Sequence, residues 1–560
     1  MSRNTNANYE VLPKIEVDRS IFDIETEVKT TFNVGELIPL CAPIDVIPGS
    51  THEIDVTKVL RLTPMVNSPY DNLFMDTYWF FVPYRLVWDK FKAFMGEQES
   101  APWKDDVSYS IPQIKIPQGG WAEGTIADYF GIPTKRNANG NDTINALPFR
   151  AYAMIYEQYF RDQNLMTPLY IPKDNATVQG ENSVTQYVNA YKGGKPLKAC
   201  KSHDLFTSCL PSPQRGEDVT ITGLAKVWNV TTSDSAYATS THGMEMRSVD
   251  GTEYGVDTKH QILGFGDGTD VLELSGMGQT YSSSGAKVPV YPSNLVVDMR
   301  TIGPNGLTIN NIREAFALQR YYEALARSGN RYTEYLKGIY GVTSEDARIQ
   351  RVEYLGGHRT PINISQVLQT SESTDTSPLG RVGGYSLTGD TGSEFTKSFT
   401  EHGMIIGLGV VRYDHTYQNM LNPIWRLKDR EDMYIPQFSN IGEQPILKEQ
   451  IYYSDSKEDN EEVFGYNEAW YMYRHRPSYV SGKMRSNATG SLDSMHFADN
   501  YTTSTPHLDE KWIQETPNNV DRVLAVAHTV TDQILMDTRI VDRAVLPMPV
   551  YSVPGLLDHN

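Results

Sequence analysis

Residues 22–32 read FDIETEVKTTF, and their side chains alternate between two kinds. The even positions carry Phe, Ile, Thr and Val, whereas the odd positions from 23 to 29 carry Asp, Glu and Lys. Successive side chains of a β-strand point to opposite faces, so this period of two predicts a strand with one solvated face. The pattern resumes over residues 52–62 (HEIDVTKVLRL), after a turn around Pro48-Gly49. Two such strands predict a half-exposed antiparallel sheet.

Further strands are predicted in the middle and near the end of the chain. Residues 76–82 (DTYWFFV) and 404–412 (MIIGLGVVR) are short and almost continuously apolar. One face of another predicted strand, near the end, carries Val520, Leu524, Val526, His528 and Val530. Strands from both ends of the chain, with long excursions between them, predict a mainly β fold. This arrangement suits a jelly roll, because its closed double sheet leaves few free edges.

A few helices are predicted to decorate this β fold. The first begins at Pro83 and ends at Gly96, and the residues on one stripe of it are Tyr84, Trp88, Phe91 and Met95. The second covers residues 148–163, and its aromatic stripe includes Tyr152, Tyr156 and Tyr159. The third runs from a capping box at Asn311 to a stop at Gly329.

Two polar stretches interrupt the predicted core. Residues 217–290 are rich in Ser, Thr, Gly and Asp, with strand-like pieces at Val219–Thr222 and Lys226–Val230, and they predict a large β-rich surface insertion. A second stretch, Ser371–Phe395, is predicted to be a loop. The chain is thus divided into a first part of the core (1–216), the insertion (217–290) and the remainder of the core (291–560).

The charge of the chain limits the partners it can bind alone. Its formal net charge is −19 and its pI is about 5.1. A free-standing nucleic-acid-binding protein normally presents a basic surface, and docking on anionic lipid also needs cations. If this protein encloses DNA, another basic component must neutralise most of the phosphates. No signal-peptide core and no membrane-spanning run is found, and Cys41, Cys200 and Cys209 match no metal or redox spacing.

No catalytic or cofactor-binding motif is supported by its context. Gly407-Leu-Gly409 lies in a predicted strand and lacks the third glycine of a dinucleotide site. His402, Asp414 and His415 lie near a strand end, but such proximity is common in loops. We therefore expect no enzyme activity, no metal and no cofactor. A carbohydrate-active β-sandwich enzyme remains the alternative.

One basic and aromatic stretch stands out, Trp470–Tyr479 (WYMYRHRPSY), followed by Lys483 and Arg485. Cations interleaved with planar rings are typical of single-stranded nucleic-acid sites, where they neutralise phosphates and stack on bases. The candidate DNA-contacting residues are Tyr471, Tyr473, Arg474, Arg476, Lys483 and Arg485. A Tyr-rich structural turn, with arginines paired to carboxylates, is the other interpretation.

Several of these segments resemble the major capsid protein of the gokushovirus branch of the microviruses, which are small icosahedral single-stranded DNA bacteriophages. The residues that carry the resemblance are SPYDNLFMDTYWFFVPYRLVWDKFKAFMGE (68–97), KSHDLFTSCLPSPQRG (201–216), NRYTEYLKGIYGVTSEDARIQRVEYLGG (330–357) and GYNEAWYMYRHRPSYVSGKMR (465–485). They are spread over most of the chain, and their order matches that of the family. The resemblance is weak at the extreme N-terminus, over 217–290 and near 371–395.

The resemblance implies a viral eight-stranded jelly roll with long loops, assembled as sixty copies in a T=1 icosahedral capsid. It implies that the insertion, Glu217 to Val290, forms a protrusion at the three-fold axes. The polar composition of the insertion fits an exposed element, so our hypothesis is that it binds a host surface receptor. It also implies a circular single-stranded DNA genome, a small basic DNA-binding packaging protein and an internal scaffolding protein. The protein is then expected in the virion, after synthesis and assembly in the bacterial host cytoplasm, without membrane insertion.

The capsid function leaves two interpretations of the aromatic helices at 83–96 and 148–163. They are inter-subunit surfaces, or they cap the barrel within one subunit. The sequence favours neither.

Overall fold

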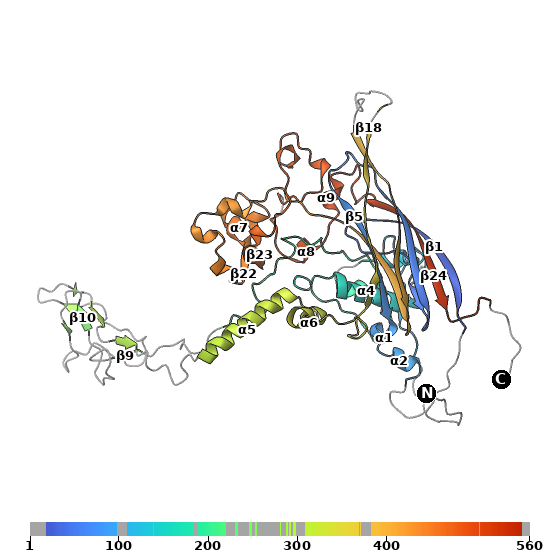
Figure 1. Ribbon diagram of the computed structural model, residues 1–560, viewed down its shortest axis with the longest axis horizontal. Coiled ribbons are helices and arrows are strands. Elements are labelled where there is room, and N and C mark those ends of the chain that lie inside the picture. Colours follow the sequence, from blue (N-terminus) through green and yellow to red (C-terminus); the bar gives the residue numbers. More distant parts are fainter. Residues whose placement is uncertain are drawn as a thin grey trace. The chain divides into compact units, whose positions relative to one another are not determined.

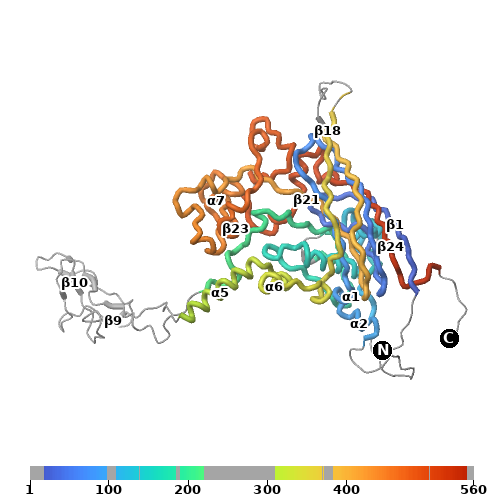
Figure 2. Tube along the Cα trace, in the orientation of Figure 1, coloured from blue at the N-terminus to red at the C-terminus, as the bar shows by residue number. Residues whose placement is uncertain are grey.

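The two ends of the chain meet in one sheet of the computed structural model (Figure 1). Strand β1 (Ser20–Phe32) pairs along its whole length with β24 (Ile534–Leu546), and β24 pairs with β4 (Thr51–Leu62). Strand β20 (Thr388–Ser398) completes the four-stranded order β1-β24-β4-β20, in which every pair is antiparallel. Figure 2 shows the blue and red strands side by side, since β1 and β24 come from opposite ends of the chain.

The structure describes residues 18–97, 109–137, 139–183, 187–219, 309–368, 370, 382–502 and 505–551, and short strands between residues 230 and 297. It divides into two compact units. One unit combines Met1–Arg215 with Glu323–Asn560, and the other is Gly216–Tyr322. The following paragraphs describe the first unit unless they say otherwise.

The second sheet has six strands, and its central strands β5 and β21 are buried on both faces. Its main order is β16 (Glu353–Gly356), β5 (Leu73–Pro83), β21 (Gly403–Tyr413) and β2 (Ile38–Pro39). Strand β17 (Arg359–Pro361) also pairs with β5, and β3 (Ile44–Val46) also pairs with β21.

Alternate residues of β5 and β21 enter different hydrophobic cores. Met75 and Trp79 of β5, with Ile405 of β21, pack in one core with the buried residues of β4 and β24. Phe80 of β5 and Ile406 of β21 point the other way, into a second core that also contains helix α4 (Leu147–Ile155). Burial on both faces explains why the 76–82 and 404–412 segments are almost continuously apolar. The first two sheets therefore form a β-sandwich with a second core behind it.

The strands of the first sheet keep one face in solvent. In β4, Ile54, Val56 and Leu60 are completely buried, and the residues between them are partly or fully exposed, apart from the buried Lys58. This confirms the strands predicted at residues 22–32 and 52–62. Strand β1 is less well covered, because Ile24 on its apolar face is 46% exposed. Its position at the edge of the sheet accounts for that exposure.

Two predicted elements near sheet edges are wrong. Residues 382–395 of the predicted loop form β19 (Val382–Ser386) and most of β20, while residues 371–381 lie outside the described ones. Strand β20 is an edge strand with only a few buried positions, so its composition is polar and rich in glycine. The strand predicted over Val520–Val530 is also wrong, because helix α9 (Asn518–Asp521) and turns occupy this stretch.

The last strand of the sheet, β24, lies further along the chain than predicted. Its inward positions include the buried Thr538 and Asp542, which break the apolar pattern that would reveal a strand. Asp542 accepts a hydrogen bond from the His52 ring at 2.9 Å, so the buried carboxylate has a partner on β4. In the 520–530 stretch, the Asp521 carboxylate accepts from the His528 amide at 2.9 Å and holds a turn.

The helix predicted over 83–96 is two short helices, α1 (Tyr84–Val87) and α2 (Phe91–Phe94). They are separated by Trp88, whose extended backbone (φ −146°) ends α1 and whose ring is fully buried. The helix predicted over 148–163 is confirmed as α4 continued by a π-helical turn over Tyr156–Phe160. Helix α5 (Ile309–Ser328), which spans the boundary of the two units, matches the third predicted helix.

The remaining elements are short. In the first unit they are α3 (Ile126–Tyr129), α6 (Tyr332–Tyr340), α7 (Lys457–Glu461), α8 (Glu510–Ile513), β6 (Gln113–Lys115), β7 (Thr143–Asn145), β8 (Val178–Gln179), β18 (Ile364–Leu368), β22 (Glu443–Leu447) and β23 (Val463–Glu468). In the second unit they are β9 (Val230–Thr232), β10 (Met246–Ser248), β11 (Glu253–Tyr254), β12 (Thr280–Tyr281), β13 (Lys287–Val288), β14 (Val290–Pro292) and β15 (Leu295–Val297). The strand-like pieces predicted at 219–222 and 226–230 lie largely outside the described residues.

Candidate functional site

The basic and aromatic segment begins immediately after β23 and is anchored by two buried rings. Trp470 adopts a left-handed backbone conformation (φ +64°), and its indole N–H donates to the Phe438 carbonyl at 2.8 Å. Tyr471 is 6% exposed, and its hydroxyl donates to the Gln450 side chain at 2.5 Å. The ring of Tyr471 is therefore not available for base stacking in this conformation, although it was a candidate.

The cations of the segment lie at the surface. Arg474, Arg476 and Lys483 are exposed, and Arg485 is half-buried. Arg474 forms an ion pair with Glu468, as the structural-turn interpretation expects for one of the arginines. The ring of Tyr473 is 58% exposed, and its hydroxyl accepts from the Tyr434 amide at 3.3 Å. Tyr479 is also exposed (67%), so two exposed tyrosine rings and three exposed cations lie on one short segment, which can offer only a few contacts to phosphates.

Residues 422–434, which were not predicted as part of a site, lie beside the basic and aromatic segment. Tyr434 packs against Trp470 and Tyr473, with ring centroids 5.6 and 6.1 Å apart. A cavity of about 330 Å³ is lined by Trp470, Tyr471 and Arg426, among others. Residues 422–430 (NPIWRLKDR) carry the same mixture of ring and cations, and this composition is the signal that could have revealed them.

The surface formed by residues 424–441 exposes large apolar side chains beside the charged residues 428–432. Its exposed large side chains are Ile424 (60%), Trp425 (77%), Met433 (55%), Tyr434 (48%), Phe438 (42%) and Ile441 (55%). Clustered exposed apolar residues of this size mark surfaces that associate with other proteins. The 424–441 surface is therefore a better candidate for an association surface than the predicted aromatic helices.

Most of the predicted inter-subunit residues lie inside the subunit itself. Trp88, Tyr152 and Tyr156 are completely buried. The hydroxyl of Tyr152 donates to the Leu37 carbonyl at 2.8 Å, and that of Tyr156 donates to the Lys198 carbonyl at 2.7 Å. Tyr84, Phe91 and Tyr159 are half-buried, and only Met95 of this set is exposed (51%). These contacts favour a role in covering the second sheet of their own subunit.

The weak catalytic candidate around His415 is a buried ion network. The His415 ring contacts Asp499 through Nδ1 and Glu515 through Nε2, each at 3.0 Å. Lys201 lies 3.6 Å from the same Asp499. Burial opposes the charged ring, but the two carboxylates outweigh burial and raise the pKa of His415 to about 10. A ring that stays protonated near neutral pH cannot act as a general base, so the network is structural.

Other chemistry is likewise limited among the residues that the structure describes. They contain no group of three or more His, Cys, Asp and Glu side chains that could hold a metal ion. The three cysteines are free, and burial raises the pKa of Cys41 to about 12 and that of Cys200 to about 11. Such thiols stay protonated and unreactive. Within the described residues, no helix is long and apolar enough to cross a membrane.

The described residues favour association with other molecules over catalysis. The β-sandwich carries no catalytic or metal centre among its described residues, and its exposed large apolar side chains at 424–441 indicate a protein that associates with others.

Comparison with known proteins gives that class its family. Residues 11–556 match the family described as capsid protein (F protein). Capsid protein VP1 of Spiroplasma virus 4 is 38% identical over 552 residues, which cover 96% of each chain. Capsid protein VP1 of Chlamydia phage 1 is 36% identical over 600 residues, or 97% of each chain. Capsid protein VP1 of Bdellovibrio phage phiMH2K is 34% identical over 561 residues, which cover 99% of this chain and 98% of that protein.

The chain belongs to the phage capsid protein (F protein) family, in its gokushovirus-type branch. It is therefore a structural protein of the virion, as the resemblance predicted. Its family implies assembly into an oligomeric shell and a non-enzymatic role.

Proposed function

We propose that sixty copies of this chain form a T=1 icosahedral shell around a circular single-stranded DNA genome, with an eight-stranded jelly roll as the wall. The observation that carries the proposal is the strand order, joined to a match with capsid proteins over almost the full length. The eight strands in chain order are β1, β2 with β3, β4, β5, β16 with β17, β20, β21 and β24.

Numbered one to eight, these strands pair as the two arms of one long hairpin. Strand one pairs with eight, two with seven, three with six and four with five, all antiparallel. Two further pairings, eight with three and seven with four, produce two sheets. One sheet contains strands one, eight, three and six, and the other contains strands two, seven, four and five. Rolling a long hairpin in this way produces the two Greek keys of a jelly roll. An experimental density map that traced a different strand order would contradict the jelly roll.

A closed shell requires each subunit to bury several patches against different neighbours, and contacts around a ring must close. Weak pairwise contacts suffice, because each copy is held by several neighbours at once. The 424–441 surface is the first patch that we assign to such contacts. Replacing Trp425 with Ser should lower the yield of assembled particles at least fivefold while leaving the melting temperature of the subunit unchanged. Normal particle yield from Trp425→Ser would remove this surface from the account.

We assign Tyr473, Arg474, Arg476, Lys483 and Arg485 to the genome-facing surface. Their few cations cannot neutralise a genome, and the net charge of −19 opposes DNA condensation by this chain alone. A small basic DNA-binding packaging protein is therefore a required partner in the proposal. The combined Arg476→Glu and Lys483→Glu variant should give particles with less DNA, measured as a lower ratio of absorbance at 260 nm to that at 280 nm. The combined Lys457→Glu and Lys511→Glu variant, at exposed positions of α7 and α8, has the same charge change and is the matched control. Equal DNA content in both double variants would refute the assignment.

We also propose that the insertion, Glu217 to Val290, forms the three-fold protrusion and binds a host surface receptor. Its polar, β-rich composition supports an exposed position, and loops on a rigid scaffold commonly carry recognition. Exchange of 217–290 with the matching segment of a related capsid protein should change adsorption to host cells. Unchanged adsorption would contradict the proposal that the insertion binds the receptor. Assembly with an internal scaffolding protein in the host cytoplasm completes the proposal.

A further inference from the structure

Strand β1 leaves one side of its backbone unpaired in the described part of the chain. The Thr63 amide donates to the Gln533 carbonyl at 2.9 Å. The backbone N–H and C=O groups of the odd-numbered residues of β24 therefore point toward β4. The backbone groups of the even-numbered residues of β24 then point the other way and form hydrogen bonds with the even-numbered residues of β1. The backbone groups of the odd-numbered residues of β1 are left on the far side of the strand. The hydroxyl of Tyr129 donates to the outward carbonyl of Thr31 at 2.9 Å, which agrees with this assignment. The amides and carbonyls of Glu25, Glu27 and Lys29 therefore point away from the sheet.

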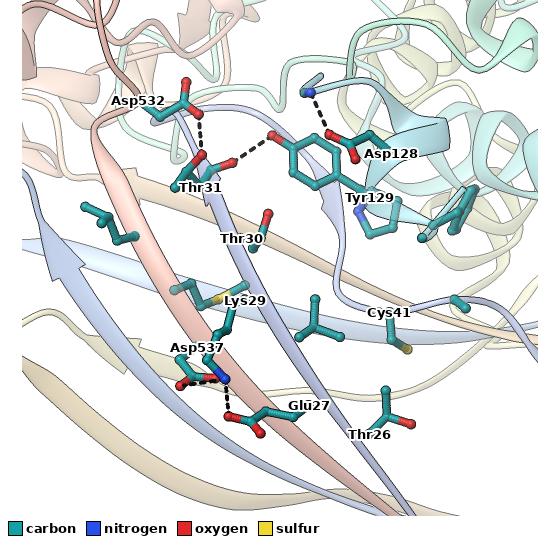
Figure 3. Close-up of a pocket in the computed structure, with 18 of the residues that line it drawn as sticks. Thr26, Glu27, Lys29, Thr30, Thr31, Cys41, Asp128, Tyr129, Asp532 and Asp537 are labelled. Atoms are coloured by element: carbon teal, nitrogen blue, oxygen red, sulfur yellow. Dashed lines mark hydrogen bonds and ion pairs between the residues drawn. The ribbon is translucent and has the colours of Figure 1, made fainter. Parts of the chain in front are cut away.

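A groove of about 910 Å³ follows this free edge (Figure 3). On the inner side of β1 it is lined by Thr26, Val28 and Thr30, and the opposite wall contains Cys41 and Tyr129. On the outer side the lining includes Val59, Arg61, Leu535 and Asp537. A groove that reaches both faces of an edge strand has the shape that an added strand would fill, since such a strand contacts both faces through alternate side chains.

The groove is negatively charged. Its acidic lining residues are Glu27, Glu123, Asp128, Asp532 and Asp537, whereas its cations are Lys29 and Arg61. Lys29 is shared by Glu27 and Asp537, the latter at 3.7 Å, as the dashed lines in Figure 3 show. An occupant with cationic side chains would reduce this excess, and an anionic one would add to it.

We propose that β1 is a docking edge for an extended, lysine- or arginine-bearing segment of another polypeptide, which adds to the sheet as a fifth strand. Main-chain hydrogen bonds to residues 25–29 would give affinity, and the acidic lining would select cationic side chains. The apolar inner face of β1, where Ile24 is 46% exposed, would be covered by alternate apolar side chains of the segment. The inference is independent of the shell geometry and genome contacts proposed above.

The test uses the full-length chain, kept as unassembled subunits, and fluorescent ten-residue peptides. The probe alternates lysine and valine. One control peptide alternates glutamate and valine, and another has the lysines and valines in two blocks. Fluorescence anisotropy measures the affinity of each peptide.

The key variant is Glu27→Pro, which removes an outward amide and leaves the ladder to β24 complete. Glu27→Ala removes the same carboxylate but keeps the amide. We expect Glu27→Pro to weaken the alternating lysine peptide at least tenfold and Glu27→Ala to weaken it less than threefold. The melting temperatures of both variants show whether the sheet is intact. If Glu27→Pro does not fold, the Asp532→Asn and Asp537→Asn double variant still tests the charge, with a loss of at least threefold expected.

Three results would overturn the proposal. The first is equal binding of the alternating lysine peptide to the folded Glu27→Pro variant and to the unmodified chain. The second is equal affinity for the alternating glutamate peptide or for the blocked lysine peptide, since either result means that strand pairing with a cationic segment is not being measured. The third is a dimer of the chain that Glu27→Pro dissociates, because the edge would then pair with a second copy of itself.

Discussion

Individual buried charges hold together segments that are distant in the sequence. His415 follows β21 and joins Asp499 and Glu515, which lie in the long segment before β24. The burial of each of these groups would be unfavourable alone, and the removal of one partner leaves an uncompensated charge. The network therefore links the end of the second sheet to the segment that leads into the first.

The pH dependence of stability follows from the raised pKa of His415. Its folded pKa of about 10 exceeds the usual value of 6.5, so its contribution is complete below pH 6.5 and is lost as the pH rises through 10. At pH 6 the free energy of unfolding of the His415→Gln variant should be about 3 kcal/mol lower than that of the unmodified chain. This difference in free energy should become smaller toward pH 10. Urea denaturation at pH 6, 8 and 10 measures it. Exposed His475→Gln is the control, and a gap for His415→Gln that widens toward pH 10 would contradict the assignment.

Gly407 shows why a glycine in a strand can be a packing residue. It lies opposite Trp79 in the β5–β21 pair, and a Cβ added to it would stand 2.7 Å from the Trp79 ring. The Gly407→Ala variant should lower the free energy of unfolding by about 2 kcal/mol. Gly389→Ala, in β20, is the matched control because a Cβ there meets no atom within 4 Å. Equal stability of the two variants in urea denaturation would show that Trp79 does not fix the size of residue 407.

At the level of elements, the sequence predicted strands best where one face is cleanly apolar. Strands β1 and β4 alternate, and β5 and β21 are almost continuously apolar, so all four were found. Strand β24 was missed because Thr538 and Asp542 occupy inward positions, and β20 was missed because an edge strand buries few residues. The compensating partners, such as His52 for Asp542, lie almost 500 residues away in the chain.

The candidate nucleic-acid segment was predicted only in part for a similar reason. Local composition identified the cations and rings, and the structure leaves Arg474, Arg476 and Lys483 exposed. The burial of Tyr471 depends on Gln450, a partner in another element that composition cannot reveal. The apolar 424–441 surface was overlooked because a pattern of scattered apolar residues does not show whether they are covered.

The aromatic helix α4 offers a test of whether its rings belong to the core. The Tyr152 hydroxyl donates to the Leu37 carbonyl and accepts from the Leu197 amide at 3.0 Å. Tyr152→Phe removes both bonds inside the protein, so the free energy of unfolding should fall by about 2 kcal/mol. The exposed Met95→Ala, in contrast, should change it by less than about 0.5 kcal/mol. Urea denaturation of the two variants measures these values. An unchanged free energy of unfolding of Tyr152→Phe would favour α4 as an inter-subunit surface.

For the molecule as a whole, function depends on which surfaces are buried inside the subunit and which are exposed to partners. The second sheet and its helices form the buried cores of the subunit, and we assign the 424–441 surface and the β1 edge to partners. In the proposed shell, the acidic net charge would leave neutralisation of the genome to another component. A capsid protein built in this way depends on several weak contacts made together rather than on one strong site.

The mass of the assembled particle tests this account most directly. The chain has a mass of 63.1 kDa, so a protein shell of sixty copies should weigh about 3.8 MDa, apart from DNA and other proteins. Charge-detection mass spectrometry of empty particles measures this value without assuming a symmetry. We predict a single population near 3.8 MDa for shells of this chain alone. Monomers and dimers at every concentration, or a closed shell with another copy number, would contradict the account.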